Sequence, residues 1–172
     1  QHLVESRSLP FSVAELTAMT IRQGIEILNS LEGLPPSPGL VDLLEKIQGL
    51  NIPLAVATSS DSETMHFILE KTGLKKYFQV TVCRNNVEKS KPAPDVYLLA
   101  ASISGVLPAD CVVFEDSENG IKAAKAAGMF CIAYSGNSSA TQNQNLADAR
   151  ISDFRELDIR RLLKLISGEN VE

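Results

Sequence analysis

Three short polar stretches with residue types that bind phosphates and metals occur in a fixed order along the chain. They are Ala57-Thr58-Ser59-Ser60, Ser90-Lys91-Pro92-Ala93-Pro94-Asp95 and Val113-Phe114-Glu115-Asp116-Ser117. Together they offer hydroxyl groups, an ammonium group and two adjacent carboxylates. Hydroxyls and free amides at a helix start bind anions, and carboxylate oxygens are ligands for Mg²⁺. The three stretches therefore predict a pocket that holds a phosphate beside a divalent metal.

The hydroxyl-bearing stretch stands where a predicted strand passes into a predicted helix. Thr58 could donate its hydroxyl to a phosphate oxygen, with the backbone amide of Ser59 beside it. Ser60 belongs to the same predicted substrate-binding turn. Taken alone, the stretch also fits a simple turn in which Ser60 caps the following helix.

The lysine stretch holds its cation between restrained backbone segments. Pro92 and Pro94 limit the conformations that the chain can adopt after Lys91. A restrained loop can point an ammonium group at a fixed place, which suits neutralisation of a phosphoryl group. The alternative is an exposed loop lysine before a helix that begins with a proline.

The acidic pair follows an apolar run. Glu115 and Asp116 are adjacent carboxylates, and such groups repel each other unless a cation lies between them. A magnesium ion commonly takes one or two protein carboxylates and keeps several waters, so the pair is a candidate Mg²⁺ site. The alternative is two solvated acids that favour the dipole at the start of a helix.

These residues require a scaffold that brings the ends of strands together. From residue 40 onward, short apolar runs alternate with helical patterns, which predicts an α/β fold: a Rossmann-like parallel sheet with helices on both faces. Ligands bind at the carboxyl ends of the strands in such sheets, where all three stretches lie. Strands are expected over residues 52–58, 78–82, 111–114, 130–133 and 149–151, and helices over 40–49, 60–73, 94–104, 118–127 and 156–166.

The first 34 residues are predicted to be helical and separate from this sheet. Ser12 and Glu15 have the spacing of a capping box, in which each side chain satisfies a free backbone amide. The proline-rich segment 33–39 cannot continue a helix and is expected to be a linker. The chain thus divides into residues 1–34 and residues 35–172.

Composition excludes several classes of partner. The chain has 172 residues, 44% of them hydrophobic, and a formal net charge of −5, which argues against a nucleic-acid binder. No apolar run approaches the roughly 20 residues that cross a bilayer, and no signal peptide is visible, so a cytoplasmic protein without a membrane partner is expected. The cysteines are odd in number and widely spaced, which predicts buried, reduced thiols at Cys83, Cys111 and Cys131.

The three stretches, extended to Asn119-Gly120-Ile121 after the acidic pair, resemble the haloacid dehalogenase superfamily, in particular its β-phosphoglucomutase-like branch of sugar-phosphate phosphatases and mutases. The resemblance covers nearly the whole chain. It implies that Thr58 binds the transferring phosphoryl group, that Lys91 neutralises it, and that Glu115 and Asp116 hold Mg²⁺ directly or through water. It also implies that residues 1–34 are the rear part of a helical cap and residues 35–172 the core, acting on a small phosphorylated metabolite.

One motif of that family is absent from the sequence. The family carries an Asp-x-Asp motif at the end of its first strand, in which the first aspartate attacks phosphorus and the second is the general acid and base. No aspartate precedes Asp42 here. Because that strand lies between the strand ending at Thr58 and the one ending near Phe114, its absence would leave two apolar strand edges facing a gap. The sequence is therefore expected to be a fragment of a longer protein and inactive by itself.

Three functions compete on these observations. The first is a Mg²⁺-dependent phosphatase or phosphomutase whose front lies outside this sequence. The second is a non-catalytic phosphate-binding or interaction module from a truncated gene. The third, a dehalogenase, ranks below them because Glu115 and Asp116 indicate a metal, which that branch of the family does not use.

Overall fold

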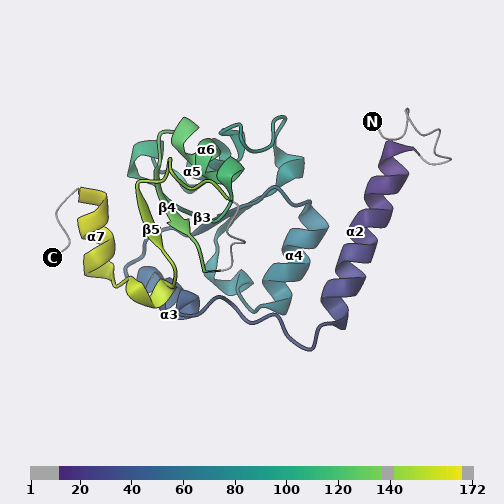
Figure 1. Ribbon diagram of the computed structural model, residues 1–172, viewed down its shortest axis with the longest axis horizontal. Coiled ribbons are helices and arrows are strands. Elements are labelled where there is room, and N and C mark those ends of the chain that lie inside the picture. The colour runs from purple at the N-terminus through teal and green to yellow at the C-terminus, as the bar shows by residue number, and fades with distance from the viewer. Residues whose placement is uncertain (1–11, 137–141, 168–172) are drawn as a thin grey trace.

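The computed structural model describes residues 12–136 and 142–167, and the helix predicted for residues 1–11 lies outside this range. Helices and strands alternate between residues 40 and 134 (Figure 1). The helices are α2 (Val13–Ser30), α3 (Leu40–Gly49), α4 (Ser62–Lys71), α5 (Asp95–Ser104), α6 (Glu118–Ala126) and α7 (Ile159–Ser167). The strands are β1 (Ala55–Ala57), β2 (Val80–Val82), β3 (Val112–Glu115), β4 (Phe130–Tyr134) and β5 (Ala149–Ile151).

All the described strand pairs are parallel, as predicted, but they form two sheets instead of one. Strand β1 pairs with β2, with Ala57 opposite Val82. Strand β4 pairs with both β3 and β5, with Glu115 of β3 opposite Ala133. Strands β1 and β3 are not paired with each other, so each leaves one edge without a partner among the described residues.

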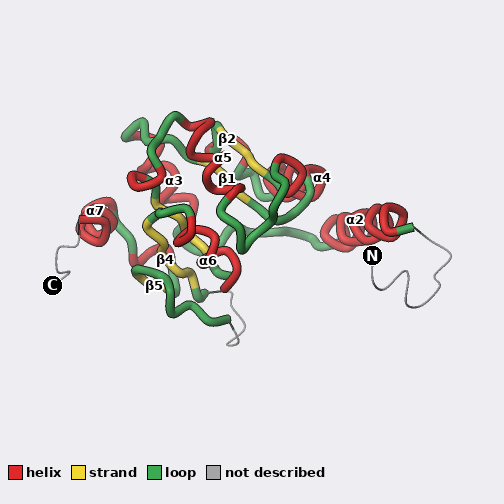
Figure 2. The backbone as a smooth tube through the Cα atoms, turned by 90° about the horizontal axis from the view of Figure 1, so that it is seen from above, coloured by secondary structure: helices red, strands yellow, loops and turns green. Residues whose placement is uncertain are grey.

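The side chains of β4 show why helices cover both faces of the larger sheet. Cys131 and Ala133 are buried in a cluster formed with α5 and α6. Ile132 and Tyr134 point the other way, into a cluster formed with α3 and α7. Successive strand residues face opposite sides of a sheet, so a strand that is apolar throughout is buried on both faces. The ribbon views show the same layering (Figures 1 and 2).

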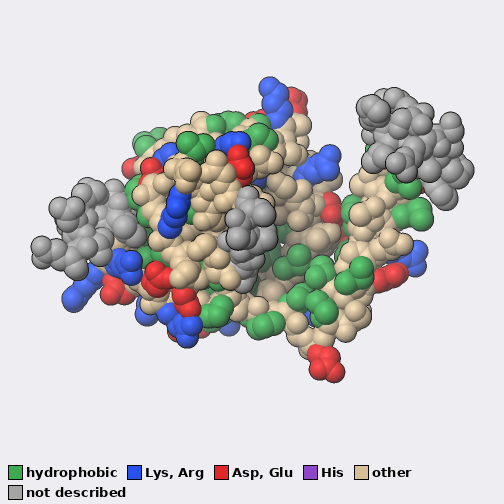
Figure 3. Space-filling model, viewed as in Figure 1, with side chains coloured by type: hydrophobic (Ala, Val, Ile, Leu, Met, Phe, Trp, Pro, Cys, Tyr) green, Lys and Arg blue, Asp and Glu red, His purple; other side chains and the backbone are tan. Residues whose placement is uncertain are grey.

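Helix α2 stands apart from this core and packs against α4 (Figure 1). It has no buried residue, and its lower end, where Ile27 and Leu31 are exposed, is rich in hydrophobic side chains (Figure 3). The ammonium of Lys71, at the end of α4, donates to the carbonyl oxygens of Leu28 and Asn29, 2.5 and 3.0 Å away. Since these are among the last carbonyls of α2, this side chain caps the helix and ties it to the core.

Several predicted boundaries are correct and others are wrong. The capping box of Ser12 and Glu15 is present at the start of α2. The alternative in which Ser60 caps the following helix is wrong, because Asp61 caps α4 by accepting a hydrogen bond from the amide of Thr64. Strands β1 and β2 are shorter than predicted, β4 is one residue longer, and Glu115 is the last residue of β3 instead of following it.

The prediction of buried, reduced thiols is confirmed for two of the three cysteines and is wrong on burial for Cys111. Cys83 and Cys131 are buried, Cys111 is half-buried, and all three are free thiols. Across residues 12–136 and 142–167, none of the helices is long and apolar enough to cross a membrane.

Candidate active site

The ammonium group of Lys91 joins the ends of the two sheets. It donates to the carbonyl oxygen of Ala57, the last residue of β1, at 3.1 Å, and to Oε1 of Glu115, the last residue of β3, at 2.7 Å. Its third hydrogen bond goes to the hydroxyl of Tyr97 on α5, at 2.9 Å. The Lys91 and Glu115 side chains are only 7% and 10% exposed. The structure therefore brings two of the predicted site residues into direct contact.

The electrostatics of this cluster favour a charged pair. Burial by itself would raise the pKa of Glu115, but the charge and hydrogen bond of Lys91, together with two hydrogen bonds from Ser117, outweigh it and lower that pKa. Burial, followed by the negative charge of Glu115, raises the pKa of Tyr97, so its hydroxyl keeps its proton. The cluster is held as ammonium, carboxylate and neutral phenol.

The start of α6 is shaped to receive the carboxylate of Glu115. Oε2 of Glu115 accepts hydrogen bonds from the amide and the hydroxyl of Ser117, at 2.9 and 2.8 Å. The hydroxyl of Ser117 in turn caps α6 by accepting from the amide of Gly120. A Cβ atom at Gly120 would lie 2.0–2.2 Å from three carboxyl atoms of Glu115. Only glycine leaves room for the acid in this position.

Asp116, the second predicted metal ligand, lies outside the buried cluster. Its side chain is exposed and makes no hydrogen bond or ion pair with the described residues. Its backbone is fixed, because the buried amide of Gln144 donates to the carbonyl oxygens of Asp116 and Tyr134, at 3.0 and 3.2 Å. In the described part of the chain there is no cluster of three or more His, Cys, Asp or Glu residues that could hold a metal. Two adjacent acids still fit Mg²⁺, which needs few protein ligands.

The hydroxyl stretch continues the end of β1. The amide of Thr58 donates to the carbonyl of Val82, and the hydroxyl of Thr58 accepts from the amide of Ser60, at 2.9 and 3.1 Å. No described group accepts a hydrogen bond from this hydroxyl, so its proton is available to a ligand. The carbonyl of Ser60 accepts from the amide of Arg84, which ties the ends of β1 and β2 together.

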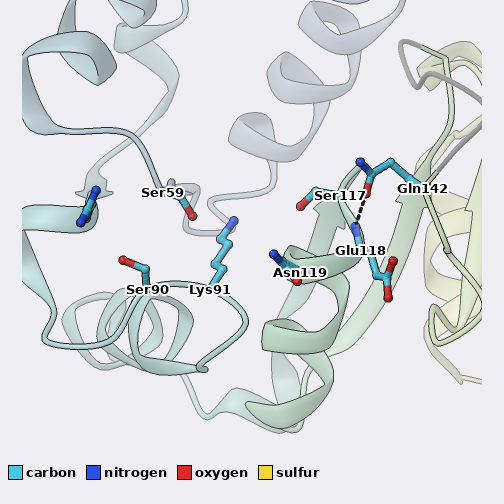
Figure 4. A pocket seen from close by; sticks show the side chains of 8 residues that line it. Ser59, Ser90, Lys91, Ser117, Glu118, Asn119 and Gln142 are labelled. Atoms are coloured by element: carbon cyan, nitrogen blue, oxygen red, sulfur yellow. Dashed lines mark hydrogen bonds between the residues drawn. The ribbon is translucent and has the colours of Figure 1, made fainter. Parts of the chain in front are cut away.

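A cavity of about 610 Å³ opens between the ends of the two sheets. The side chain of Lys91 rises between one wall with Ser59 and Ser90 and an opposite wall at the start of α6 (Figure 4). On the second wall, the amide of Glu118 donates to the side chain of Gln142 at 3.0 Å (Figure 4). The residues that line the cavity are Ser59, Arg84, Ser90, Lys91, Ser117, Glu118, Asn119 and Gln142.

The predicted site residues are close in the fold but differ in their exposure to this cavity. Ser59 and Lys91 line it, and Glu115 does not line it but accepts a hydrogen bond from Lys91. The other predicted residues, Thr58, Ser60 and Asp116, are not among the lining residues.

Sequence reasoning missed four residues that complete the site. Tyr97 could have been found from its place on the first turn of the helix that follows Lys91. Arg84 stands two residues after the end of β2, and a charged residue at the carboxyl end of a parallel strand is a candidate for ligand binding. No local pattern identifies Gln142 and Gln144, because they come from a loop that is distant in sequence from their partners.

Comparison with known proteins agrees with this geometry. Residues 7–134 match the family model of haloacid dehalogenase-like hydrolases. The chain is 46% identical over 103 residues to fructose-1-phosphate phosphatase YqaB of Escherichia coli, covering 60% of this chain and 52% of that protein. It is 35% identical over 140 residues to the putative phosphatase YhcW of Bacillus subtilis, covering 81% of this chain and 64% of that protein.

A solved structure shares the fold over most of the chain. CbbY from Rhodobacter sphaeroides, crystallised as a variant in complex with xylulose-(1,5)bisphosphate, superposes with a TM-score of 0.80 at 30% identity. The superposition covers 87% of this chain and 67% of that one. Against YqaB and YhcW, the chain spans only 52% and 64% of the relative's length.

Proposed function

The chain belongs to the haloacid dehalogenase-like hydrolase family, and from this we propose that it is the phosphate-binding core of a Mg²⁺-dependent phosphatase or phosphomutase for phosphorylated sugars and similar small metabolites. The observation that carries the proposal is the buried ammonium of Lys91, which joins the carboxyl ends of β1 and β3 beneath a polar cavity. Parallel sheets bind ligands at this edge. The names of the relatives, a fructose-1-phosphate phosphatase among them, support the substrate class.

We assign the phosphoryl group to the hydroxyl stretch and Lys91. Thr58 has a hydroxyl proton to donate, since its oxygen accepts from the amide of Ser60 and donates to no described group. Ser59 lines the cavity beside it. Lys91 would supply positive charge, and stabilisation of developing charge is commonly the largest catalytic contribution. A phosphate in this position would lie between the walls that carry Ser59 and Ser117.

We assign the metal to the acids at the end of β3. Asp116 is exposed and without a hydrogen-bonding partner among the described residues, so its carboxylate can bind an ion directly. Glu115 already accepts from Lys91 and twice from Ser117, which leaves it to act mainly through water. When bound, Mg²⁺ would neutralise charge on the phosphoryl oxygens.

We further propose that the nucleophilic aspartate belongs to a strand outside this sequence, which would lie between β1 and β3. Two observations support this: no aspartate precedes Asp42, and β1 and β3 each leave an edge unpaired among the described residues. Residues 1–34 would be the rear of a helical cap and residues 35–172 the core. The separation of α2 from the core supports that division. The cytoplasmic setting stays a prediction.

Enzyme assays test the proposal. The 172-residue chain should not hydrolyse p-nitrophenyl phosphate with Mg²⁺, because it lacks the attacking carboxylate. Robust turnover that is abolished by Lys91→Ala would contradict this. The coding sequence upstream of Gln1 should contain an in-frame Asp-x-Asp motif after an apolar run. A reading frame without that motif would favour the non-catalytic binding module.

The metal assignment has its own test. In a protein that carries the Asp-x-Asp motif, hydrolysis should depend on added Mg²⁺ and be lost on Asp116→Ala, because the exposed carboxylate is the direct ligand. Asp110→Ala is the matched control, since Asp110 is an exposed acid before β3. Hydrolysis by the Asp116 variant without added metal would remove the assignment.

A further inference from the structure

Of the three charged side chains that line the cavity, two are paired and one is not. Lys91 is paired with Glu115 at 2.7 Å. Glu118, on the opposite wall, is paired with Lys122 at 2.6 Å. Arg84 also lines the cavity, yet its guanidinium makes no ion pair or hydrogen bond with any described residue. The cavity therefore carries one uncompensated positive charge, which favours an anionic ligand.

Lys91 has little hydrogen-bonding capacity left for a ligand. An ammonium group has three donors, and those of Lys91 go to Ala57, Tyr97 and Glu115. The five N–H donors of a guanidinium, in contrast, form a planar fork that matches a phosphate or carboxylate. Of the two cations that line the cavity, Arg84 is the one with unused donors.

The backbone that carries Arg84 is held in place. Arg84 begins a short 3-10 turn (η2, Arg84–Asn86), and its amide donates to the carbonyl of Ser60 at 3.0 Å. The side chain of Asn86 accepts from the amide of Cys83, and that of Asn85 accepts from the amide of Ser62, at 2.9 and 3.0 Å. The turn is thereby tied to both β2 and α4, so Arg84 extends from a fixed base at the cavity rim.

We propose that Arg84 binds a second anionic group on the substrate, at a site separate from the phosphoryl group that Thr58 binds and the charge of Lys91 stabilises. The substrate class would be sugars with two anionic groups: bisphosphates, or monophosphates that also carry a carboxylate. A cavity of about 610 Å³ lies in the range of sites for whole small molecules. This inference rests on the proposed function, because it takes the first phosphate position from it.

Binding measurements on the chain test this without requiring turnover. The ligands are fructose 1-phosphate, fructose 1,6-bisphosphate and 6-phosphogluconate, measured by titration calorimetry with Mg²⁺. We expect both doubly anionic ligands to bind about tenfold tighter than the monophosphate, and Arg84→Ala to remove that advantage while changing monophosphate affinity less than about threefold. Comparison of the last two ligands shows whether the second group is a phosphate or a carboxylate.

Two further variants control for general charge and for geometry. Lys89→Ala removes one positive charge from the same loop at an exposed position that does not line the cavity, so it should leave the selectivity intact. Arg84→Lys keeps the charge but loses the planar fork and should recover only part of the affinity. Arg84 is exposed, so the thermal midpoint of each variant should match that of the wild type.

The outcomes separate this inference from the proposed function. Equal losses of affinity for all three ligands in Arg84→Ala would show that Arg84 binds the first phosphate. Unchanged affinities would show that it binds neither anionic group. Either result overturns the inference and leaves the proposed function standing. A wild-type chain that binds fructose 1-phosphate without preferring the doubly anionic ligands also overturns it alone. A wild-type chain that binds none of the ligands contradicts both the inference and the proposed function.

Discussion

The two walls of the cavity are built in opposite ways. The closed wall is the cluster of Lys91, Tyr97, Glu115, Ser117 and Gly120, of which Lys91 and Ser117 line the cavity and the others lie behind them. Its members are buried or half-buried, and its polar side chains hydrogen-bond to one another. The open wall, formed by Ser59, Arg84 and Ser90, is exposed, and its cation has no partner among the described residues.

This difference follows from the cost of burial. A charge removed from water must be paired and hydrogen-bonded, so the residues of the closed wall can hold only one arrangement. Exposed groups are solvated and can exchange water for a ligand at little cost. We infer that the closed wall fixes the geometry of the site and that the open wall supplies its selectivity. Substitutions in the closed wall should therefore lower the free energy of unfolding more than substitutions at exposed positions.

The largest effect is expected for Lys91→Ala. Removing the ammonium leaves the carboxylate of Glu115 buried without its charged partner, and breaking a buried ion pair from one side costs about 3–5 kcal/mol. Chemical denaturation at pH 7 measures the free energy of unfolding. Lys122→Ala is the matched control, because its pair with Glu118 is substantially exposed and should contribute about 0–1 kcal/mol.

Similar losses in the two lysine variants would show that the closed wall is no more constrained than the surface. The comparison between the walls would then fail, together with the fixed geometry inferred from it. A larger loss for Lys91→Ala alone would support both.

A smaller effect, with an informative sign, is expected at Gly120. Replacing glycine by alanine inside a helix usually stabilises it by about 1 kcal/mol. At Gly120 the added Cβ would meet the carboxyl group of Glu115 at 2.0–2.2 Å, so we expect a loss of about 1–3 kcal/mol from overpacking. Gly24 of α2 is the control: it has nothing within 4 Å of an added Cβ, and Gly24→Ala should stabilise the protein.

The sign of the difference between the two glycine variants is the decisive measurement. If thermal unfolding shows both substitutions to be stabilising, the carboxyl group of Glu115 can move aside at no cost. The closed wall would then be adaptable, contrary to its hydrogen-bonding pattern.

Features set by neighbouring residues could be predicted from the sequence, whereas features set by distant contacts could not. The capping box of Ser12 and Glu15 is local chemistry, and the structure contains it. Strand β4 is apolar throughout, and it is buried on both faces. The cap of α4 is one residue later than the predicted Ser60, because Ser60 and Asp61 are both good caps and the spacing alone does not choose between them.

The site shows the same division. The three stretches predicted which strand ends meet, and the contact between Lys91 and Glu115 agrees with that prediction. The role of Gln144 depends on two carbonyls that are distant in sequence, and no periodicity encodes such a contact. The unpaired cation at Arg84 depends on the pairing of the other two charged lining residues, Lys91 and Glu118, with distant or helical partners.

The smallest effect concerns the support behind the closed wall. Asp148 accepts from Lys125 of α6 and from the amide of Cys131 in β4, which ties the helix that carries Gly120 to the sheet. Burial by itself would raise the pKa of Asp148, but the hydrogen bonds from Lys125 and Cys131 outweigh it and lower that pKa below its usual 3.8. Asp148→Asn keeps an acceptor for the amide and removes the charge, so we expect a loss of about 1 kcal/mol at pH 7.

The pH dependence of that loss identifies its cause. A carboxylate with a lowered pKa in the folded state stabilises the protein fully above its unfolded pKa of about 4, and this contribution is lost as the pH falls through the folded value. The difference in unfolding free energy between wild type and Asp148→Asn should therefore shrink below about pH 4. Asp61 and Asp153 also have lowered pKa values, so only this difference, and not the acid unfolding of the wild type, isolates Asp148. In a Lys125→Ala background most of the difference should disappear at every pH, because the charge then has no partner. A difference that stays constant from pH 7 to about pH 3 would mean that Asp148 supports the wall by shape and not by charge.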